Sequence, residues 1–202
     1  MSAPEPAVPA PRSPLAGVAT TGRYGAAGGT PLAIAEIPAA IVQLAARRGR
    51  AGDLARAVSG AFGLDLPPPG RAASARGIDA IWIQPDAWLL LAPRGAEGAL
   101  AAEVKRAAGD AGSVVDQSHG KTLMSLAGAA ARRVMAKGCR LDLDAPAFGP
   151  GRAAVTQIAQ IGCVVHQRDA IPTYGLVVPS SLAIPFFEWL TSSAAEFGYE
   201  VG

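Results

Sequence analysis

The sequence predicts an α+β fold of two pseudo-repeated ferredoxin-like lobes, each of the βαββαβ type. Apolar periodicity over residues 41–116 follows the order strand, helix, strand, strand, helix, strand, and a similar order begins again at residue 121. The segment PGRAA occurs at 69–73 and again at 150–154, and WLLLAP (88–93) is matched in pattern by YGLVVP (174–179). Because such repeats at matching positions indicate a duplicated architecture, we expect residues 31–202 to form one folded unit with lobes at 31–118 and 119–202.

The first lobe begins with a short apolar strand and an amphipathic helix. In that helix Leu54, Val58 and Phe62 recur at i, i+4 and i+8 on one face, and Gly63 stands where a left-handed C-terminal cap is expected. A turn containing Pro85 joins the next two strands into a hairpin. The elements expected in this lobe are strands at 41–44, 78–83, 88–92 and 113–116 and helices at 50–62 and 96–108.

The second lobe repeats this pattern with an additional polar turn segment at 142–149. Ser180 and Ser181 precede the last apolar helix and are expected to cap its N-terminus, since Ser oxygens accept hydrogen bonds from free backbone amides there. The elements expected in this lobe are strands at 121–126, 154–160, 163–167 and 174–178 and helices at 129–137 and 180–195.

Residues 1–30 are rich in Pro, Ala and Gly, and we expect them to form a flexible arm because they offer little apolar surface to bury. This stretch lacks the apolar region of a secretory signal, and the chain contains no run of about 18 apolar residues that would span a membrane. Cys139 and Cys163 are too few and too far apart for a disulfide scaffold. We therefore expect a reduced, cytoplasmic protein with no membrane contact.

The charge balance excludes one class of partner and suggests another. With 18 basic and 16 acidic residues the net charge is +2, which is too small to provide the concentrated basic field that nucleic acid binding needs. Half of the residues are apolar and only 17% are charged. This composition indicates that part of the surface is covered by a protein partner, and that the isolated chain can self-associate.

The polar segment DQSHGK follows the last strand of the first lobe and contains the strongest candidate site residues. A Ser-His-Asp triad is disfavoured, because neighbouring residues on a strand point to opposite faces and no nucleophile-elbow glycines surround the serine. In the alternative interpretation the Asp and Ser oxygens bind backbone amides in a turn, and the Gly permits a positive φ where the chain enters the second lobe. The candidate junction and partner-contact residues are Asp116, Gln117, Ser118, His119, Gly120 and Lys121.

Metal and nucleotide sites have weak support. His119, Cys139, Cys163 and His166 are the only imidazole and thiol groups, and only Cys163 and His166 have a spacing near that of a structural zinc site. Two buried cysteines and two polar histidines are the alternative. Neither G-x-G-x-x-G after a strand nor G-x-x-x-x-G-K-[ST] occurs. We therefore expect no metal, no nucleotide and no self-sufficient catalytic site on this chain.

The block VVDQSHGKTLMSLAGAAARRVMAKGCRLDLDAPAFGPGRAAVTQI (114–158) strongly resembles the gamma subunit of heterotetrameric sarcosine oxidase. The segments LAARR (44–48), GLDLPPP (63–69) and WIQPDAWLLLAP (82–93) are similar to that family as well. The resemblance covers about residues 31–200, all but the expected arm.

The same block resembles, more distantly, the folate-binding T-protein of the glycine cleavage system. Positions that match the wider pattern are Asp116, Ser118, Gly128, Ala131, Asp142 and Pro150-Gly151-Arg152. In T-proteins a following hairpin ends in an acidic residue that serves the folate chemistry. Here Val165, His166 and Gln167 stand in its place, so the proton transfer that a carboxylate would support lacks its group.

The resemblance implies a non-catalytic subunit of a flavin-dependent complex in sarcosine catabolism and one-carbon metabolism. That complex oxidises sarcosine to glycine with oxygen and tetrahydrofolate. It carries FAD, FMN, NAD, zinc and tetrahydrofolate on its alpha, beta and delta subunits, which would be the partners of this chain. The alternative is a free-standing folate-binding or one-carbon-transfer protein, which predicts an aromatic pocket with a carboxylate for the pterin ring.

Overall fold

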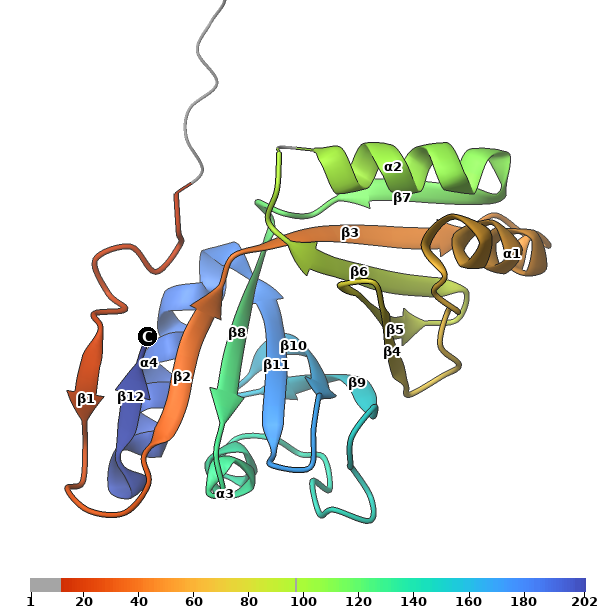
Figure 1. Cartoon of the computed structure of the whole chain (residues 1–202). Coiled ribbons are helices and arrows are strands. Elements are labelled where there is room, and N and C mark those ends of the chain that lie inside the picture. The colour runs from red at the N-terminus through yellow and green to blue at the C-terminus, as the bar shows by residue number, and fades with distance from the viewer. Residues whose placement is uncertain (1–11, 97) are drawn as a thin grey trace, which may run out of the picture.

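The computed structural model describes residues 12–96 and 98–202 and shows an α+β architecture built on two sheets (Figure 1). The strands of the two sheets run in clearly different directions, and each sheet carries its own helices on its outer face. The predicted fold class is confirmed.

The first sheet has five strands in the order β4-β5-β6-β3-β7 and is covered by the helices α1 and α2. The order β5-β6-β3-β7 is that of a ferredoxin-like βαββαβ unit, and β4 extends it by a hairpin with β5. Its elements are β3 (Ala39–Ala46), α1 (Ala51–Phe62), β4 (Ala72–Ala75), β5 (Ile78–Gln84), β6 (Ala87–Pro93), α2 (Ala99–Ala108) and β7 (Gly112–Asp116).

The second sheet has seven strands in the order β1-β12-β2-β8-β11-β10-β9, with α3 and α4 on its outer face. The arrangement β9-β10-β11-β8 repeats β4-β5-β6-β3, but β2 takes the place next to β8 that β7 takes next to β3. Its elements are β1 (Gly22–Tyr24), β2 (Leu32–Ile37), β8 (Lys121–Ala127), α3 (Ala131–Ala136), β9 (Ala153–Ile158), β10 (Ile161–Gln167), β11 (Thr173–Pro179), α4 (Ala183–Ala194) and β12 (Tyr199–Val201).

The two PGRAA segments contact each other. The backbone N–H of Ala72 donates to the carbonyl of Gly151 at 2.9 Å, and the N–H of Ala153 donates to the carbonyl of Gly70 at 2.9 Å. Between them Arg71 and Arg152 form an antiparallel bridge. Each copy of the motif thus makes the same bond to the other copy, as expected for two lobes related by a pseudo-two-fold axis.

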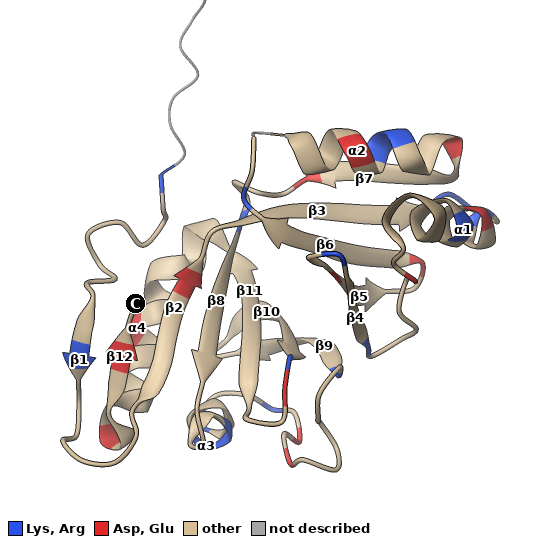
Figure 2. Ribbon diagram, in the orientation of Figure 1, with Lys and Arg blue, Asp and Glu red and all other residues tan. Residues whose placement is uncertain are grey.

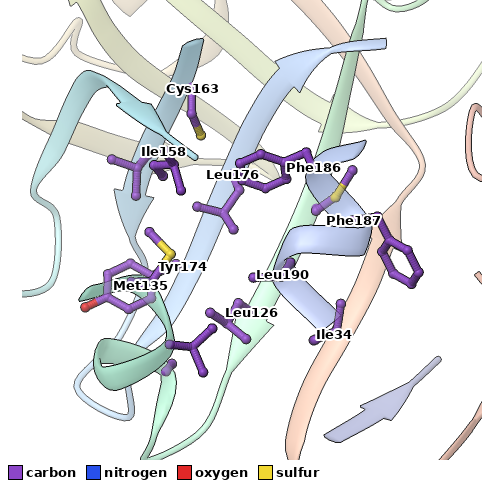
Figure 3. Close-up of a cluster of buried hydrophobic side chains, with 14 of the residues drawn as sticks. Ile34, Leu126, Met135, Ile158, Cys163, Tyr174, Leu176, Phe186, Phe187 and Leu190 are labelled. Carbon is purple, nitrogen blue, oxygen red and sulfur yellow. The ribbon is translucent and has the colours of Figure 1, made fainter. Parts of the chain in front are cut away.

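Strand alternation creates three layers of apolar contact, because successive side chains point to opposite faces of a sheet. In β3, Val42 and Leu44 face α1 and α2, whereas Ile41 faces the other sheet. The cluster between the sheets holds the lobes together and comprises Ala39, Ile41, Ile81, Leu89, Leu91, Leu123, Ala153, Val164 and Val177. The largest cluster lies under α4, where Figure 3 shows Phe186 and Leu190 facing Leu176 and Leu126.

The predicted arm at 1–30 needs correction where the structure describes it. Residues 1–11 lie outside the described residues, but Leu15 is fully buried in the cluster under α4. The strand β1 pairs with β12, and the Tyr24 and Tyr199 rings stack at 5.5 Å. A single large apolar side chain and one edge strand are enough to hold residues 12–30 against the second lobe.

The lobe boundary predicted at residue 31 does not coincide with the division between the two sheets. The strand β2 pairs with β8 and β12 in the seven-stranded sheet, so residues 32–37 belong with the second lobe and the first lobe begins at β3. This strand could not be assigned from local periodicity, since its partners lie more than 80 residues further along the chain.

The capping residues predicted from the sequence are confirmed at the C-terminus of α1 and are wrong at the N-terminus of α4. Gly63 caps α1 in the left-handed conformation with φ 62°, as predicted. Ser180 and Ser181 form a short 3-10 turn (Ser180–Leu182) and do not cap α4 through their side chains. The Ser180 hydroxyl lies instead 3.0 Å from the Thr122 hydroxyl on β8.

Candidate functional site

The chain crosses between the two sheets at two neighbouring places. Pro38 alone separates β2 from β3, and residues 117–120 connect β7 to β8. The crossings are tied together, because the N–H of Gln117 donates to the carbonyl of Ile41 at 2.7 Å and the N–H of Ser180 donates to the carbonyl of Gly120 at 3.0 Å. The DQSHGK segment therefore lies at the lobe junction, as its place in the sequence predicts.

Hydrogen bonds in this segment are those of a structural turn. The Asp116 carboxylate accepts from the backbone N–H of Ser118 at 2.9 Å. The Ser118 hydroxyl oxygen accepts from the N–H of Ile41 at 3.0 Å and lies 3.4 Å from the carbonyl of the same residue. Since both functions of the hydroxyl are used by β3, Ser118 serves as a clamp between the crossings and is not placed as a nucleophile.

The remaining residues of the segment divide between the turn and the surface. His119 is exposed, and its ring nitrogens lie 3.3 and 3.5 Å from an Arg94 guanidinium nitrogen. The predicted positive φ at Gly120 is wrong, because Gly120 is not among the residues in the left-handed region. A Cβ at Gly120 would come within 2.9 Å of the Gln117 side-chain oxygen, the end of a flexible side chain that can move aside.

A pocket of about 270 Å³ opens beside this turn, between the ends of β2, β3, β6, β8 and β11. Its apolar lining includes Ile37 and Leu123. Figure 2 shows basic segments where β8 meets the five-stranded sheet and an acidic segment at the end of β2. The polar residues that line the pocket include Arg12, Glu36, Arg94, Lys121, Thr122 and Ser180.

His166 is the titratable member of the three residues, Val165, His166 and Gln167, that stand where the T-protein resemblance places an acidic residue. It lies on β10 with only 4% of its surface exposed, and its ring packs over Gly175 on β11. Neither ring nitrogen makes a hydrogen bond of good geometry with the described residues. Burial, opposed by Asp79 and the Gly175 backbone and assisted by nearby Arg168, lowers the pKa of His166 to about 4. The ring is therefore neutral at pH 7.

These residues do not fit folate chemistry. A neutral, buried imidazole cannot replace a carboxylate that attracts a cationic intermediate. A Cβ at Gly175 would stand 2.0 Å from the His166 ring, so the space over this strand is already filled by the histidine.

The thiols are placed for packing. Cys163 is buried and Cys139 is half-buried, and both are free. Burial raises the pKa of both thiols, which disfavours the reactive thiolate. Among the described residues no group of three His, Cys, Asp or Glu side chains is arranged to hold a metal ion. In the same part of the chain no helix is long and apolar enough to cross a membrane.

Sequence reasoning found the turn but missed most of the pocket. Glu36, Arg94, Thr122 and Ser180 come from four separate strand ends, and no local motif marks them. The available signal was the repeated apolar-Pro pattern, because Arg94 and Ser180 each follow one copy of it.

Comparisons with known proteins agree on one family. Residues 48–196 match the family described as "Sarcosine oxidase, gamma subunit family". The chain is 36% identical over 130 residues to a sarcosine oxidase subunit gamma from Corynebacterium sp. (strain P-1), covering 64% of this chain and 63% of that protein. It thus spans slightly less than two thirds of that relative. It is also 36% identical over 151 residues to a subunit gamma from Arthrobacter sp, covering 74% and 72%.

Solved structures show the same likeness in three dimensions. A chain of the heterotetrameric sarcosine oxidase from Corynebacterium sp. U-96 superposes with a TM-score of 0.81 and 29% identity, covering 93% of this chain and 96% of that chain. Aminomethyltransferase T of the glycine cleavage system from Bartonella henselae has a TM-score of 0.59 at 18% identity, covering 82% and 49%. This second likeness concerns the fold alone. On the match of its own residues 48–196, the chain belongs to the sarcosine oxidase gamma subunit family.

Proposed function

We propose that this chain is a non-catalytic subunit of a heterotetrameric sarcosine oxidase. The observation that carries the proposal is the superposition on a chain of such a complex, with 96% of that chain covered. Its partners would be the alpha, beta and delta subunits. The complex would convert sarcosine to glycine with oxygen and tetrahydrofolate, and this chain would support the assembly of the large subunits.

The local chemistry supports a role without catalysis. Ser118 and His166 are the residues nearest to a catalytic pattern, and their side chains serve the turn and the packing between strands. FAD, FMN, NAD, zinc and tetrahydrofolate would accordingly be bound by the other subunits. Two free cysteines are consistent with a cytoplasmic, reducing location.

Co-expression tests this proposal. The tagged chain is produced together with alpha, beta and delta subunits of a sarcosine oxidase from the same source and purified by its tag. We expect a yellow complex with flavin absorbance that forms hydrogen peroxide when sarcosine is added. Recovery of this chain alone, colourless and able to bind tetrahydrofolate tightly, would contradict the proposal and favour a free folate-binding protein.

A further inference from the structure

The pocket at the lobe junction contains a lysine that lacks a carboxylate partner in the described part of the chain. Lys121 is the first residue of β8 and is half-buried in the pocket wall. Within residues 12–96 and 98–202, no ion pair or side-chain hydrogen bond of Lys121 is found. The carboxylate of Glu36 lines the same pocket and accepts a hydrogen bond from the Ser13 hydroxyl, but its single negative charge is outnumbered there by Lys121, Arg12 and Arg94. A half-buried ammonium without a counter-charge favours an anion supplied from outside.

A pair of hydroxyl groups lines the same pocket as this lysine. Thr122, only 4% exposed, and Ser180 have their oxygens 3.0 Å apart, and both residues line the pocket. One hydroxyl hydrogen is used in the bond between them. The other hydrogen can donate to a ligand, because each hydroxyl carries one donor. The pocket lining thus contains an ammonium, a hydroxyl donor and apolar side chains, which are the groups that can bind one carboxylate with a short aliphatic stem.

We propose that this pocket binds the carboxylate of an acidic residue on a partner subunit. The inference rests on the proposed function and adds a docking site to it. A volume of about 270 Å³ lies below the roughly 300–1,000 Å³ of pockets for drug-sized ligands, but it accommodates one Asp or Glu side chain. Arg12 and Arg94 add positive charge at the rim, which provides charge complementarity to an acidic surface and speeds association.

The test uses the co-expressed complex and variants of this chain. Lys121→Glu reverses the charge in the pocket, and Thr122→Val removes a hydroxyl with little change in shape. Lys105→Glu, on an exposed position of α2 outside the pocket, is the matched control for an equal change in net charge. Affinity for the other subunits is measured by titration at low and at high salt, and the melting temperature of each isolated variant checks folding.

We expect Lys121→Glu to weaken association at least tenfold at low salt and Thr122→Val to weaken it severalfold, with Lys105→Glu close to wild type. The effect of Lys121→Glu should shrink at high salt, because screening weakens the charge pair in the wild type. A charge swap, in which one partner acid is changed to Lys, should restore binding to Lys121→Glu. If Lys121→Glu does not fold, Lys121→Met and Thr122→Val decide the result.

Three results would overturn the inference. Variants that associate as tightly as wild type would show that the pocket is not a docking site, and the proposed function would stand. Stabilisation of the isolated wild-type chain, but not of Lys121→Glu, by millimolar acetate or glycine would assign the pocket to a small carboxylate. If the isolated wild-type chain self-associates and the isolated Lys121→Glu chain does not, the pocket would be assigned to contact with a second copy of this chain. A wild-type chain that does not associate with the other subunits at all would instead contradict the proposed function.

Discussion

His166 determines the chemical character of the hairpin formed by β10 and β11. Its imidazole fills the space above Gly175 and lies between the two sheets, near Asp79 on β5 and Arg168 after β10. Arg168 and Asp79 are themselves 3.9 Å apart. A residue that is neutral and enclosed in this way contributes to the packing of the strands and is poorly suited to proton transfer at pH 7.

The stability of the chain should therefore depend on pH through His166. In the unfolded chain His166 has its ordinary pKa near 6.5, whereas burial lowers the folded pKa to about 4. Between these values the unfolded state binds a proton that the folded state does not, so stability is complete above pH 6.5 and falls as the pH approaches 4. The loss amounts to about 3 kcal/mol at most.

Urea unfolding at pH 7, 5.5 and 4.5 measures this dependence. His166→Phe, which keeps a ring of similar shape, should remove most of the loss between pH 6.5 and 4. His119→Phe serves as the control, because His119 is exposed. An equal pH dependence in wild type and His166→Phe would show that other groups cause the acid sensitivity.

Glycine is required at position 175 because the His166 ring, on the neighbouring strand β10, occupies the space that a Cβ would need. Gly175→Ala places a Cβ 2.0 Å from the His166 ring, and overpacking of this kind costs about 1–3 kcal/mol of unfolding free energy. Gly162→Ala on β10, where no atom lies within 4 Å of the added Cβ, should change stability little. The double variant with His166→Ala should recover most of the loss in Gly175→Ala, and additive effects in denaturant titrations would contradict this coupling.

At the scale of elements, the segment before β2 is part of the second lobe. Leu15 is fully buried under α4, although it lies outside the residues that match the family. Leu15→Ala should lower the unfolding free energy by about 2–4 kcal/mol, as expected for a large apolar side chain removed from a core. Val18→Ala, at a position that is 37% exposed, should have a much smaller effect. If urea unfolding shows an equally small loss of unfolding free energy in Leu15→Ala and Val18→Ala, residues 12–20 pack only loosely and the prediction is contradicted.

Elements with strong local signals were predictable from the sequence. The amphipathic helix at 51–62, the hairpin around Pro85 and the duplicated strand order all depend on neighbours within a few residues, and the structure contains each of them. The strands β1, β2 and β12 are short or weakly patterned and depend on partners at the opposite end of the chain. Long-range pairing of this kind is not encoded in any local window.

The site was predictable only in part for the same reason. The DQSHGK turn was located correctly, and the Asp116 hydrogen bond has the expected form. The pocket beside it combines strand ends from both sheets, so its composition follows from topology. The unused capping serines illustrate this point, because Ser180 faces Thr122 across the junction.

At the scale of the whole molecule, two pseudo-equivalent lobes enclose an apolar layer between their sheets and leave a basic pocket where the chain crosses between them. This arrangement places a recess with polar lining residues at the junction of the two lobes. Exposed apolar side chains at Val115, Val155 and Ile171 lie elsewhere on the surface and provide contact area for larger partners.

Native mass spectrometry of the purified co-expressed complex tests the central claim most directly. We predict an intact assembly that contains one copy of this 20.4 kDa chain together with one alpha, one beta and one delta subunit, and that loses the chain as a unit on mild activation. An alpha, beta and delta assembly that forms without this chain, beside the free chain as a separate species, would contradict the account.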